Sequence, residues 1–197
     1  STLLNKIIGE KISIENKKIN TTQSMILGVK NINQTQLIFY DTPGSNFLKS
    51  LNKESNNLKI NLWNGIDESD IIVYLIDSKT TNINFLSDQL EKLQEINKKI
   101  IIIFNKIDLI TKKKLLPLIS ILDEKFKIDS FFTISAIKKI GIDEFLNYIK
   151  NFSYTSKWIF NDDEITNKDD NFIINELLRE TILTYLHKEI PYNVIIK

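Results

Sequence analysis

The 197-residue sequence predicts an α/β protein with a mostly parallel sheet and helices on both of its faces. Continuous apolar runs at residues 71–76, 100–104 and 131–134 are typical of strands that are covered on both faces. Between these runs, apolar side chains recur at helical spacing in residues 85–96 and 115–126. Strands that alternate with helices of this length are joined by right-handed crossovers, which make neighbouring strands parallel.

The elements around this core are predicted from shorter signals. A first helix is expected at residues 3–8, because apolar residues recur there at helical spacing and Gly9 follows as a usual helix terminator. Apolar segments at residues 26–32 and 36–40 lie on either side of polar turn residues and predict a hairpin. Residues 142–149 supply the last helix of the core.

The pattern changes after residue 149. Residues 151–170 are polar and acidic and are expected to form a linker. Residues 172–186 are strongly amphipathic and predict a helix, and a strand-like segment follows at residues 194–196. The chain is therefore predicted to divide into residues 1–150, 151–170 and 171–197.

Composition excludes several classes of protein. Hydrophobic residues make up 42% and charged residues 26%, which is ordinary for a globular protein. A net charge of +1 gives no overall basic field for nucleic acid, although a local basic surface stays open. The absence of cysteine excludes disulfides and thiolate metal sites. No apolar run approaches the roughly 20 residues of a membrane-spanning helix.

A phosphate contact is predicted where the strand at residues 36–40 ends. Asp41-Thr42-Pro43-Gly44 follows it, and a carboxylate there can hold the water shell of a Mg²⁺ bound to nucleotide phosphates. Gly44 has no side chain and can bring its backbone N–H against a γ-phosphate. A strand that ends in a Pro-Gly turn has the same sequence, so this motif is weak by itself.

The motif Asn105-Lys106-Ile107-Asp108, after residues 100–104, is more specific. A carboxylate accepts hydrogen bonds from N1–H and the exocyclic amine of guanine, a pair that adenine does not offer. A base without that pair leaves a buried charge unpaired, so Asp108 is expected to select guanine. We expect Asn105 to brace the loop and the stem of Lys106 to lie along the purine face. A polar loop after a buried strand is the plainer alternative.

Ser135-Ala136 follows residues 131–134 and is the third motif. Small residues there let backbone N–H groups approach O6 of guanine. The pair says little by itself, but the three motifs lie in order at three strand ends, where open α/β sheets place their ligands. Together they predict a guanine-nucleotide site.

Two hydroxyl residues are predicted to serve a Mg²⁺ ion. Thr22 lies in the loop before the hairpin, where a hydroxyl would sense the γ-phosphate, and Ser1 would be the Mg²⁺-coordinating hydroxyl of a phosphate-binding loop. The predicted Mg²⁺ ligands are thus Ser1, Thr22 and Asp41. Each hydroxyl also has a structural alternative, a threonine that starts a strand and a serine that caps a helix. No side chain is assigned as catalytic.

These motifs resemble the Era-type GTPases, bacterial Ras-like proteins of small-subunit ribosome assembly. The resemblance covers nearly the whole chain and is carried by residues 1–6, 9–14, 20–22, 41–44, 105–108 and 135–136. It continues through residues 172–192, which resemble the helix and turn that open an RNA-binding KH domain. That C-terminal stretch separates the Era type from related tRNA-modification and tandem-domain assembly GTPases.

The resemblance implies a Ras-like GTPase domain at residues 1–150, a linker at 151–170 and the beginning of a KH domain at 171–197. It implies GTP or GDP with Mg²⁺ as ligands, slow hydrolysis, and switching of the loops around Thr22 and residues 44–58. The implied partners are 16S-type rRNA and the small ribosomal subunit. We expect a cytoplasmic monomer, with room for peripheral association with the inner membrane.

Three departures limit what carries over from the family. The sequence lacks the G-x-x-x-x-G-K loop and its strand, so no lysine reaches the β- and γ-phosphates. The KH segment stops before the G-x-x-G loop that clamps RNA. Gln23 and Ser45 stand where the family usually has an arginine and an aliphatic residue, and Ser45 does not restore a water-orienting glutamine.

We expect the sequence to be a fragment, truncated at both ends. In a Ras-like sheet, the absent strand lies between the strands that end at Asp41 and Asp77. Its roughly four or five buried aliphatic side chains, at about 1.5–3 kcal/mol each, are comparable to the roughly 5–15 kcal/mol that keeps a domain folded. A sharp cooperative melt without nucleotide would contradict this expectation.

Two other functions stay open from the sequence. One is a non-hydrolysing module that docks RNA or protein without turnover. The other is a related ribosome-assembly or tRNA-modification GTPase. Nucleotide titration and turnover separate the first from a GTPase, and a G-x-x-G loop after Pro191 excludes the second.

Overall fold

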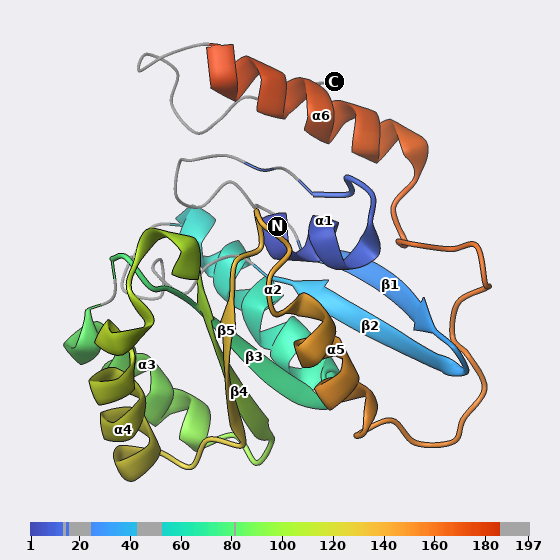
Figure 1. Ribbon diagram of the computed structural model, residues 1–197. Helices are drawn as coiled ribbons and strands as arrows, with labels where there is room; N and C mark the ends of the chain where they lie inside the picture. The colour runs from blue at the N-terminus through green and yellow to red at the C-terminus, as the bar shows by residue number, and fades with distance from the viewer. Residues whose placement is uncertain (14, 16–24, 43–52, 81, 186–197) are drawn as a thin grey trace. The chain divides into compact units, whose positions relative to one another are not determined.

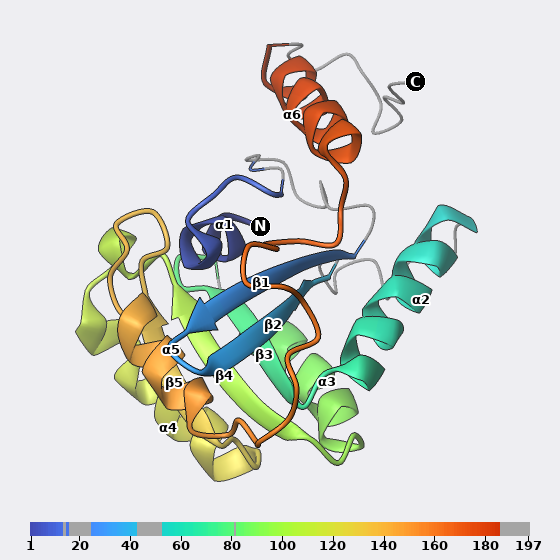
Figure 2. The same ribbon diagram turned by 90° about the vertical axis from the view of Figure 1, so that its right-hand side faces the viewer.

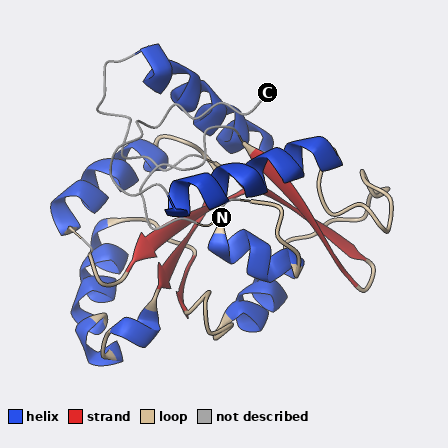
Figure 3. Cartoon of the chain, turned by 90° about the horizontal axis from the view of Figure 1, so that it is seen from above, coloured by secondary structure: helices blue, strands red, loops and turns tan. Residues whose placement is uncertain are grey.

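The computed structural model describes residues 1–13, 15, 25–42, 53–80 and 82–185. Its elements are α1 Thr2–Ile8, β1 Ile26–Ile32, β2 Thr35–Asp41, α2 Lys53–Glu68, β3 Ile71–Asp77, α3 Ile83–Gln94, β4 Lys99–Asn105, α4 Leu116–Lys125, β5 Ser130–Ile134, α5 Ile142–Lys150 and α6 Asp170–Tyr185. Short 3-10 turns, η2 Ile107–Leu109 and η3 Lys112–Lys114, follow β4. The predicted alternation of strands and helices is confirmed (Figures 1 and 3).

The chain forms two compact units. One comprises Ser1–Asp67 together with Ser153–Lys197, and the other comprises Glu68–Phe152. The strands of the described residues form a two-stranded sheet, β1-β2, in the first unit and a three-stranded sheet, β3-β4-β5, in the second. No helix of the described residues is long and apolar enough to cross a membrane.

The sheet of the second unit, Glu68–Phe152, is parallel throughout, with β4 in its centre. Helices α3 and α4 cover one face of the sheet and α5 covers the other (Figure 1). Residues 100–104 of β4 are each 2% exposed or less, which explains why this strand is apolar without alternation.

Strand register places the polar strand ends of this sheet side by side. Asp77 at the end of β3 pairs with Asn105 at the end of β4, and Asn105 pairs with Ile134 of β5. The loops that follow β3, β4 and β5 therefore leave the sheet at one edge, where parallel α/β sheets bind their ligands.

The first unit is built around an antiparallel hairpin. Strand β1 pairs with β2 from Ile26 opposite Asp41 to Ile32 opposite Thr35. Helix α1 packs against β1 at Gly28, where a Cβ atom would lie 2.7 Å from the side chain of Leu4. A side chain at this position would displace the end of the Leu4 side chain, so glycine favours the close packing of α1 on the hairpin.

Helix α2 was not predicted from the sequence. It begins at Lys53, so residues 53–58, which were expected to belong to a switching loop, are helical. The sequence of α2 is rich in asparagine and other weak helix formers, so its propensity gives little signal. The helix is instead stabilised by tertiary packing. At Gly65 a Cβ atom would lie 2.7 Å from Thr42 and 3.1 Å from the sulfur of Met25.

Part of the predicted linker is bound to the hairpin. We call residues 158–166 the strap (Figure 2). The N–H of Val29 donates to the carbonyl of Ile165 at 2.8 Å, and the hydroxyl of Thr166 donates to the carbonyl of Leu27 at 2.7 Å. The strap thus occupies hydrogen-bonding groups along the outer edge of β1, which would otherwise be open to another strand.

The side chain of Gln36 on β2 holds the other end of the strap. Its Oε1 accepts the N–H groups of Ile159 and Phe160 at 3.0 and 2.9 Å, and its Nε2 donates to the carbonyl of Phe160 at 3.0 Å. The indole N–H of Trp158 also donates to the carbonyl of Gln34. One amide therefore makes three hydrogen bonds to the strap backbone.

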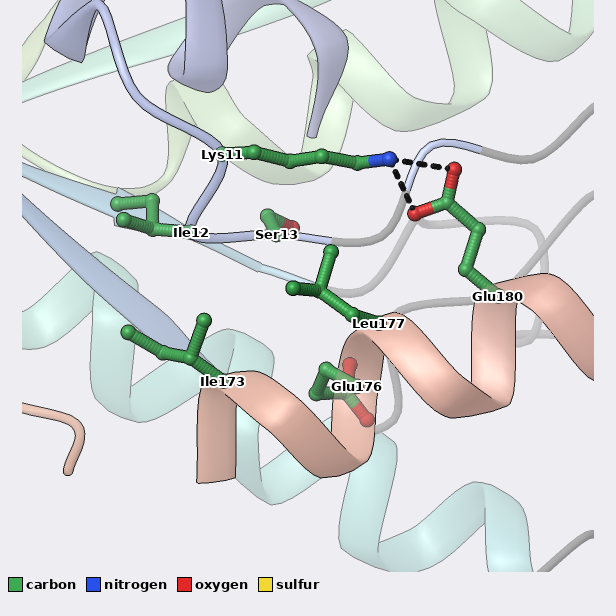
Figure 4. A pocket seen from close by; sticks show the side chains of 7 residues that line it. All are labelled: Lys11, Ile12, Ser13, Ile173, Glu176, Leu177 and Glu180. Atoms are coloured by element: carbon green, nitrogen blue, oxygen red, sulfur yellow. Dashed lines mark hydrogen bonds and ion pairs between the residues drawn. The ribbon is translucent and has the colours of Figure 1, made fainter. Parts of the chain in front are cut away.

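Helix α6 follows the strap and lies against the segment after α1. The carboxylate of Asp169 accepts the N–H of Phe172 at 2.8 Å and caps the helix. The ammonium of Lys11 lies 2.9 Å from both carboxylate oxygens of Glu180. Figure 4 shows the shallow pocket between the two segments, lined by Lys11, Ile12, Ser13, Ile173, Glu176, Leu177 and Glu180. The strand predicted at residues 194–196 lies outside the described residues.

Replacing Gln36 by alanine removes three hydrogen bonds to the strap while leaving the hairpin register intact. We expect amide hydrogen exchange at Ile159 and Phe160 to accelerate, because their N–H groups lose their acceptor. The matched control is Gln34→Ala, since the side chain of Gln34 is exposed and only its backbone carbonyl binds the strap. Equal exchange rates in the two variants would contradict the role given to Gln36.

Candidate nucleotide-binding site

Asn105 joins the loops that follow β4 and β5. Its side-chain Oδ1 accepts the N–H of Lys106 at 2.8 Å and the N–H of Ala136 at 3.0 Å. The residue is 9% exposed, so these bonds form in a largely desolvated place where an unpaired N–H is costly. The structure thereby brings together the Asn105 motif and the Ser135-Ala136 motif that the sequence predicted. Backbone N–H groups of Ser135-Ala136 were expected to approach O6 of guanine, and the N–H of Ala136 is directed at Asn105.

Asp108 is held by a residue of the second loop. The hydroxyl of Ser135 donates to Oδ1 of Asp108 at 2.6 Å, and Ser135 is itself fully buried. The hydrogen bond from Ser135 lowers the pKa of Asp108 below its ordinary value. Partial desolvation acts in the opposite direction, and the positive charge of Lys138 adds to the lowering of this pKa. The carboxylate is therefore charged at neutral pH, and the hydrogen bond from Ser135 holds its direction.

Lys106 adopts the left-handed backbone conformation, with φ of 64°. A residue with a Cβ atom rarely takes this conformation, and such residues cluster at functional sites. Its ammonium lies 2.6 Å from Oδ2 of Asp77 at the end of β3. Asp77 was not among the predicted site residues.

The electrostatics of Asp77 follow from these contacts. Partial burial acts to raise the pKa of Asp77, but the hydrogen bonds from Lys106 and from the N–H of Lys79, with the charge of Lys106, outweigh it. The pKa of Asp77 therefore lies below its ordinary value, and the pair with Lys106 is ionic at neutral pH.

Asp41, predicted to serve Mg²⁺, belongs to the first compact unit. Its Oδ2 accepts the hydroxyl of Ser13 at 3.1 Å and lies 2.8 Å from the backbone nitrogen of Ser1. Ser1 and Asp41 are thus neighbours, and the contact is an ion pair between the terminal ammonium of Ser1 and the carboxylate. Thr22 and Gly44 lie outside the described residues.

A buried asparagine orders the segment beside Asp41. The Oδ1 of Asn5 accepts the N–H groups of Ile12 and Ser13 at 3.0 Å each, and its Nδ2 donates to the carbonyl of Ser13 at 2.7 Å. Asn5 therefore fixes Ser13, which in turn contacts Asp41. No role was predicted for Asn5, because its partners lie seven and eight residues away in an irregular segment.

Comparison with known proteins identifies the family. The sequence model of the family described as 50S ribosome-binding GTPase matches residues 1–106. GTPase Era from Rickettsia bellii (strain OSU 85-389) is 35% identical over 197 residues, which are 100% of this chain and 66% of that protein. The chain thus spans slightly less than two thirds of that relative.

Solved structures of Era share the fold. Era in complex with MgGDPNP and nucleotides 1506–1542 of 16S ribosomal RNA is 31% identical, with a TM-score of 0.88 over 96% of this chain and 64% of that one. A substitution variant of Aquifex aeolicus Era bound to GDP and AlF4⁻ is also 31% identical, with a TM-score of 0.89 over 98% of this chain and 65% of that one.

The predicted Ras-like α/β fold is confirmed by this similarity, which extends over nearly the whole chain. The predicted family is confirmed as well, since the relatives and the solved structures are both Era. The chain therefore belongs to the 50S ribosome-binding GTPase family, and within that family it is of the Era type.

Proposed function

We propose that this chain acts as an Era-type GTPase that binds GTP and GDP with Mg²⁺, hydrolyses GTP slowly and serves small-subunit ribosome assembly through rRNA. The observation that carries the proposal is the fixed carboxylate of Asp108, held by Ser135 at 2.6 Å in a loop pair that Asn105 joins. A charged acceptor held in one direction is the group that guanine recognition requires.

The proposed base contacts come from the second compact unit. Asp108 accepts N1–H and the exocyclic amine of guanine, and the stem of Lys106 covers the purine face. Asn105 and Ser135 hold the two loops, and the small side chain of Ala136 leaves room for the base edge. The hydrogen bonds of Asn105 to the two loops and of Ser135 to Asp108 support the roles of Asn105 and Ser135.

The proposed phosphate and Mg²⁺ contacts are Ser1, Thr22, Asp41 and Gly44. Asp41 would hold Mg²⁺ through its water shell, and Gly44 would sense the γ-phosphate. The carboxylate of Asp41 is already fixed by Ser13, which supports its assignment. Relatives bound to MgGDPNP and to GDP with AlF4⁻ support GTP, GDP and Mg²⁺ as ligands.

The proposed catalysis relies on positioning and electrostatics, because the sequence offers no side chain as a general base. That arrangement is consistent with slow turnover and with a switch between nucleotide states. GTP binding without turnover would favour the non-hydrolysing module instead.

The proposed partner is the small ribosomal subunit. Era was solved with a segment of 16S ribosomal RNA, and this supports rRNA as the partner of the present chain. We further propose that residues 1–150 form the GTPase domain, 151–170 the linker and 171–197 the beginning of a KH domain. A cytoplasmic monomer that associates peripherally with the inner membrane completes the proposal.

Replacing Asp108 by asparagine should weaken GDP binding at least about 100-fold, since hydrogen bonds to a charged acceptor contribute about 1.5–3 kcal/mol each. The variant should instead prefer xanthosine diphosphate, because an amide can donate to the C2 carbonyl of xanthine. Titration with fluorescent GDP and xanthosine diphosphate in Mg²⁺ measures both effects. Asp143→Asn, at an exposed position of α5, is the control. Unchanged GDP affinity in Asp108→Asn would refute the assignment.

Replacing Asn105 by alanine should destabilise the second unit by about 1–3 kcal/mol, because the N–H groups of Lys106 and Ala136 lose a shared, largely buried acceptor. Urea denaturation measures the loss. Asn151→Ala is the control, since Asn151 is exposed at the end of α5. Equal stability of the two variants would show that Asn105 does not join the loops.

A further inference from the structure

The ion pair between Lys106 and Asp77 is the contact at the candidate site that the proposed roles leave unexplained. Its two members come from adjacent strand ends, because Asp77 pairs with Asn105 in the parallel register. The distance from Nζ of Lys106 to Oδ2 of Asp77 is 2.6 Å. The contact therefore reaches across the edge of the sheet from the end of β3 to the first residue after β4.

The carboxylate of Asp77 is itself held in place. Its Oδ1 accepts the N–H of Lys79 at 2.9 Å, so one oxygen is used by the turn and the other faces Lys106. The N–H of Ser78 donates to the carbonyl of Asn105 at 3.0 Å and joins the same two strand ends through the backbone. Lys106 is thus bound to a fixed anion and not to a mobile one.

Stability does not explain this pair. The side chains of Lys106 and Asp77 are 46% and 31% exposed, and ion pairs of such exposure add little to folding because water screens them. The consequence of the pair is geometric: it fixes both ends of the lysine side chain. The left-handed backbone sets the direction in which the stem leaves the loop, and Asp77 sets where the ammonium lies.

A lysine that covers a purine must give up the freedom of a long side chain when the base binds. Affinity falls by the cost of that ordering unless the side chain is already ordered in the free protein. A carboxylate that holds the ammonium beforehand removes much of this cost.

We propose that Asp77 is a positioning residue of the nucleotide site, which holds the ammonium of Lys106 so that its stem lies ready for the purine face. The inference rests on the proposed guanine-nucleotide binding and deepens it. Asp77 contacts no part of the base in this account and acts only through Lys106.

The test uses this chain with Asp77→Asn, Lys106→Met and the double variant. Asparagine keeps an oxygen for the N–H of Lys79 but removes the charge, and methionine keeps an apolar stem without the ammonium. The matched control is Asp129→Asn, because Asp129 also pairs with a lysine, Lys99, at 3.2 Å and also accepts a backbone N–H. The exposures of this pair, 48% and 26%, are close to those of the first.

Binding of GDP and of inosine diphosphate is measured for each variant by calorimetry in Mg²⁺. Asp77→Asn should bind both nucleotides about 3- to 10-fold more weakly, the range expected when one lysine must be immobilised on binding. Because the stem covers any purine, the ratio of the two affinities should not change. Asp129→Asn should bind GDP as the unmodified chain does. In the Lys106→Met background, Asp77→Asn should have no further effect.

Three results would overturn the inference. The first is an Asp77→Asn variant that binds GDP normally. The second is an effect of Asp77→Asn that persists undiminished with Lys106→Met, which would show that Asp77 does not act through the lysine. The third is a changed ratio between GDP and inosine diphosphate, which would show that the loop bearing Asp108 has been displaced. Failure of the unmodified chain to bind GDP would overturn the proposed function, and this inference with it.

Discussion

The amide of Asn105 is the constraint on which the proposed base-recognition region depends. A single Oδ1 atom accepts one N–H from the loop after β4 and one from the loop after β5. Strand β4 is the most buried strand of the sheet, so the position of this atom is set by the core. Asp108 and Ser135 lie on the loops that the amide joins, so their positions are constrained by the rigid core.

In the first compact unit, too, the side-chain amide of a buried asparagine binds backbone groups of an irregular segment. Asn5 is buried on α1 and binds the backbone of Ile12 and Ser13 through both ends of its amide. A short amide carries a donor and an acceptor in fixed geometry, so it can replace the regular backbone pairing that an irregular segment lacks. In the first unit the buried Asn5 fixes Ser13, which contacts Asp41. In the second unit the buried Asn105 fixes the loop whose Ser135 holds Asp108.

The sequence predicted the elements whose burial leaves a recognisable apolar pattern. It missed the elements and residues whose position depends on contacts with residues far away in the chain. The run at residues 100–104 marks β4 because every side chain there is covered. Helix α2 gave no such signal, since its place is set by contacts of Gly65 with Thr42 and Met25. The motif residues 105, 108, 135 and 136 could be proposed as site residues from the sequence because strand ends are recognisable there. Asp77 also ends a strand, but its partner is visible only in three dimensions.

The strap shortens the flexible part of the connection into α6. The polar composition of residues 151–170 suggests a free spacer, but residues 158–166 are bonded to the hairpin at both ends. Only residues 167–169 separate the last of these bonds from α6, and the four Cα–Cα steps from Thr166 to Asp170 span at most about 14 Å when fully extended. The length of these residues therefore limits how far α6 can move from the hairpin. A larger movement would first have to break the hydrogen bonds between the strap and β1.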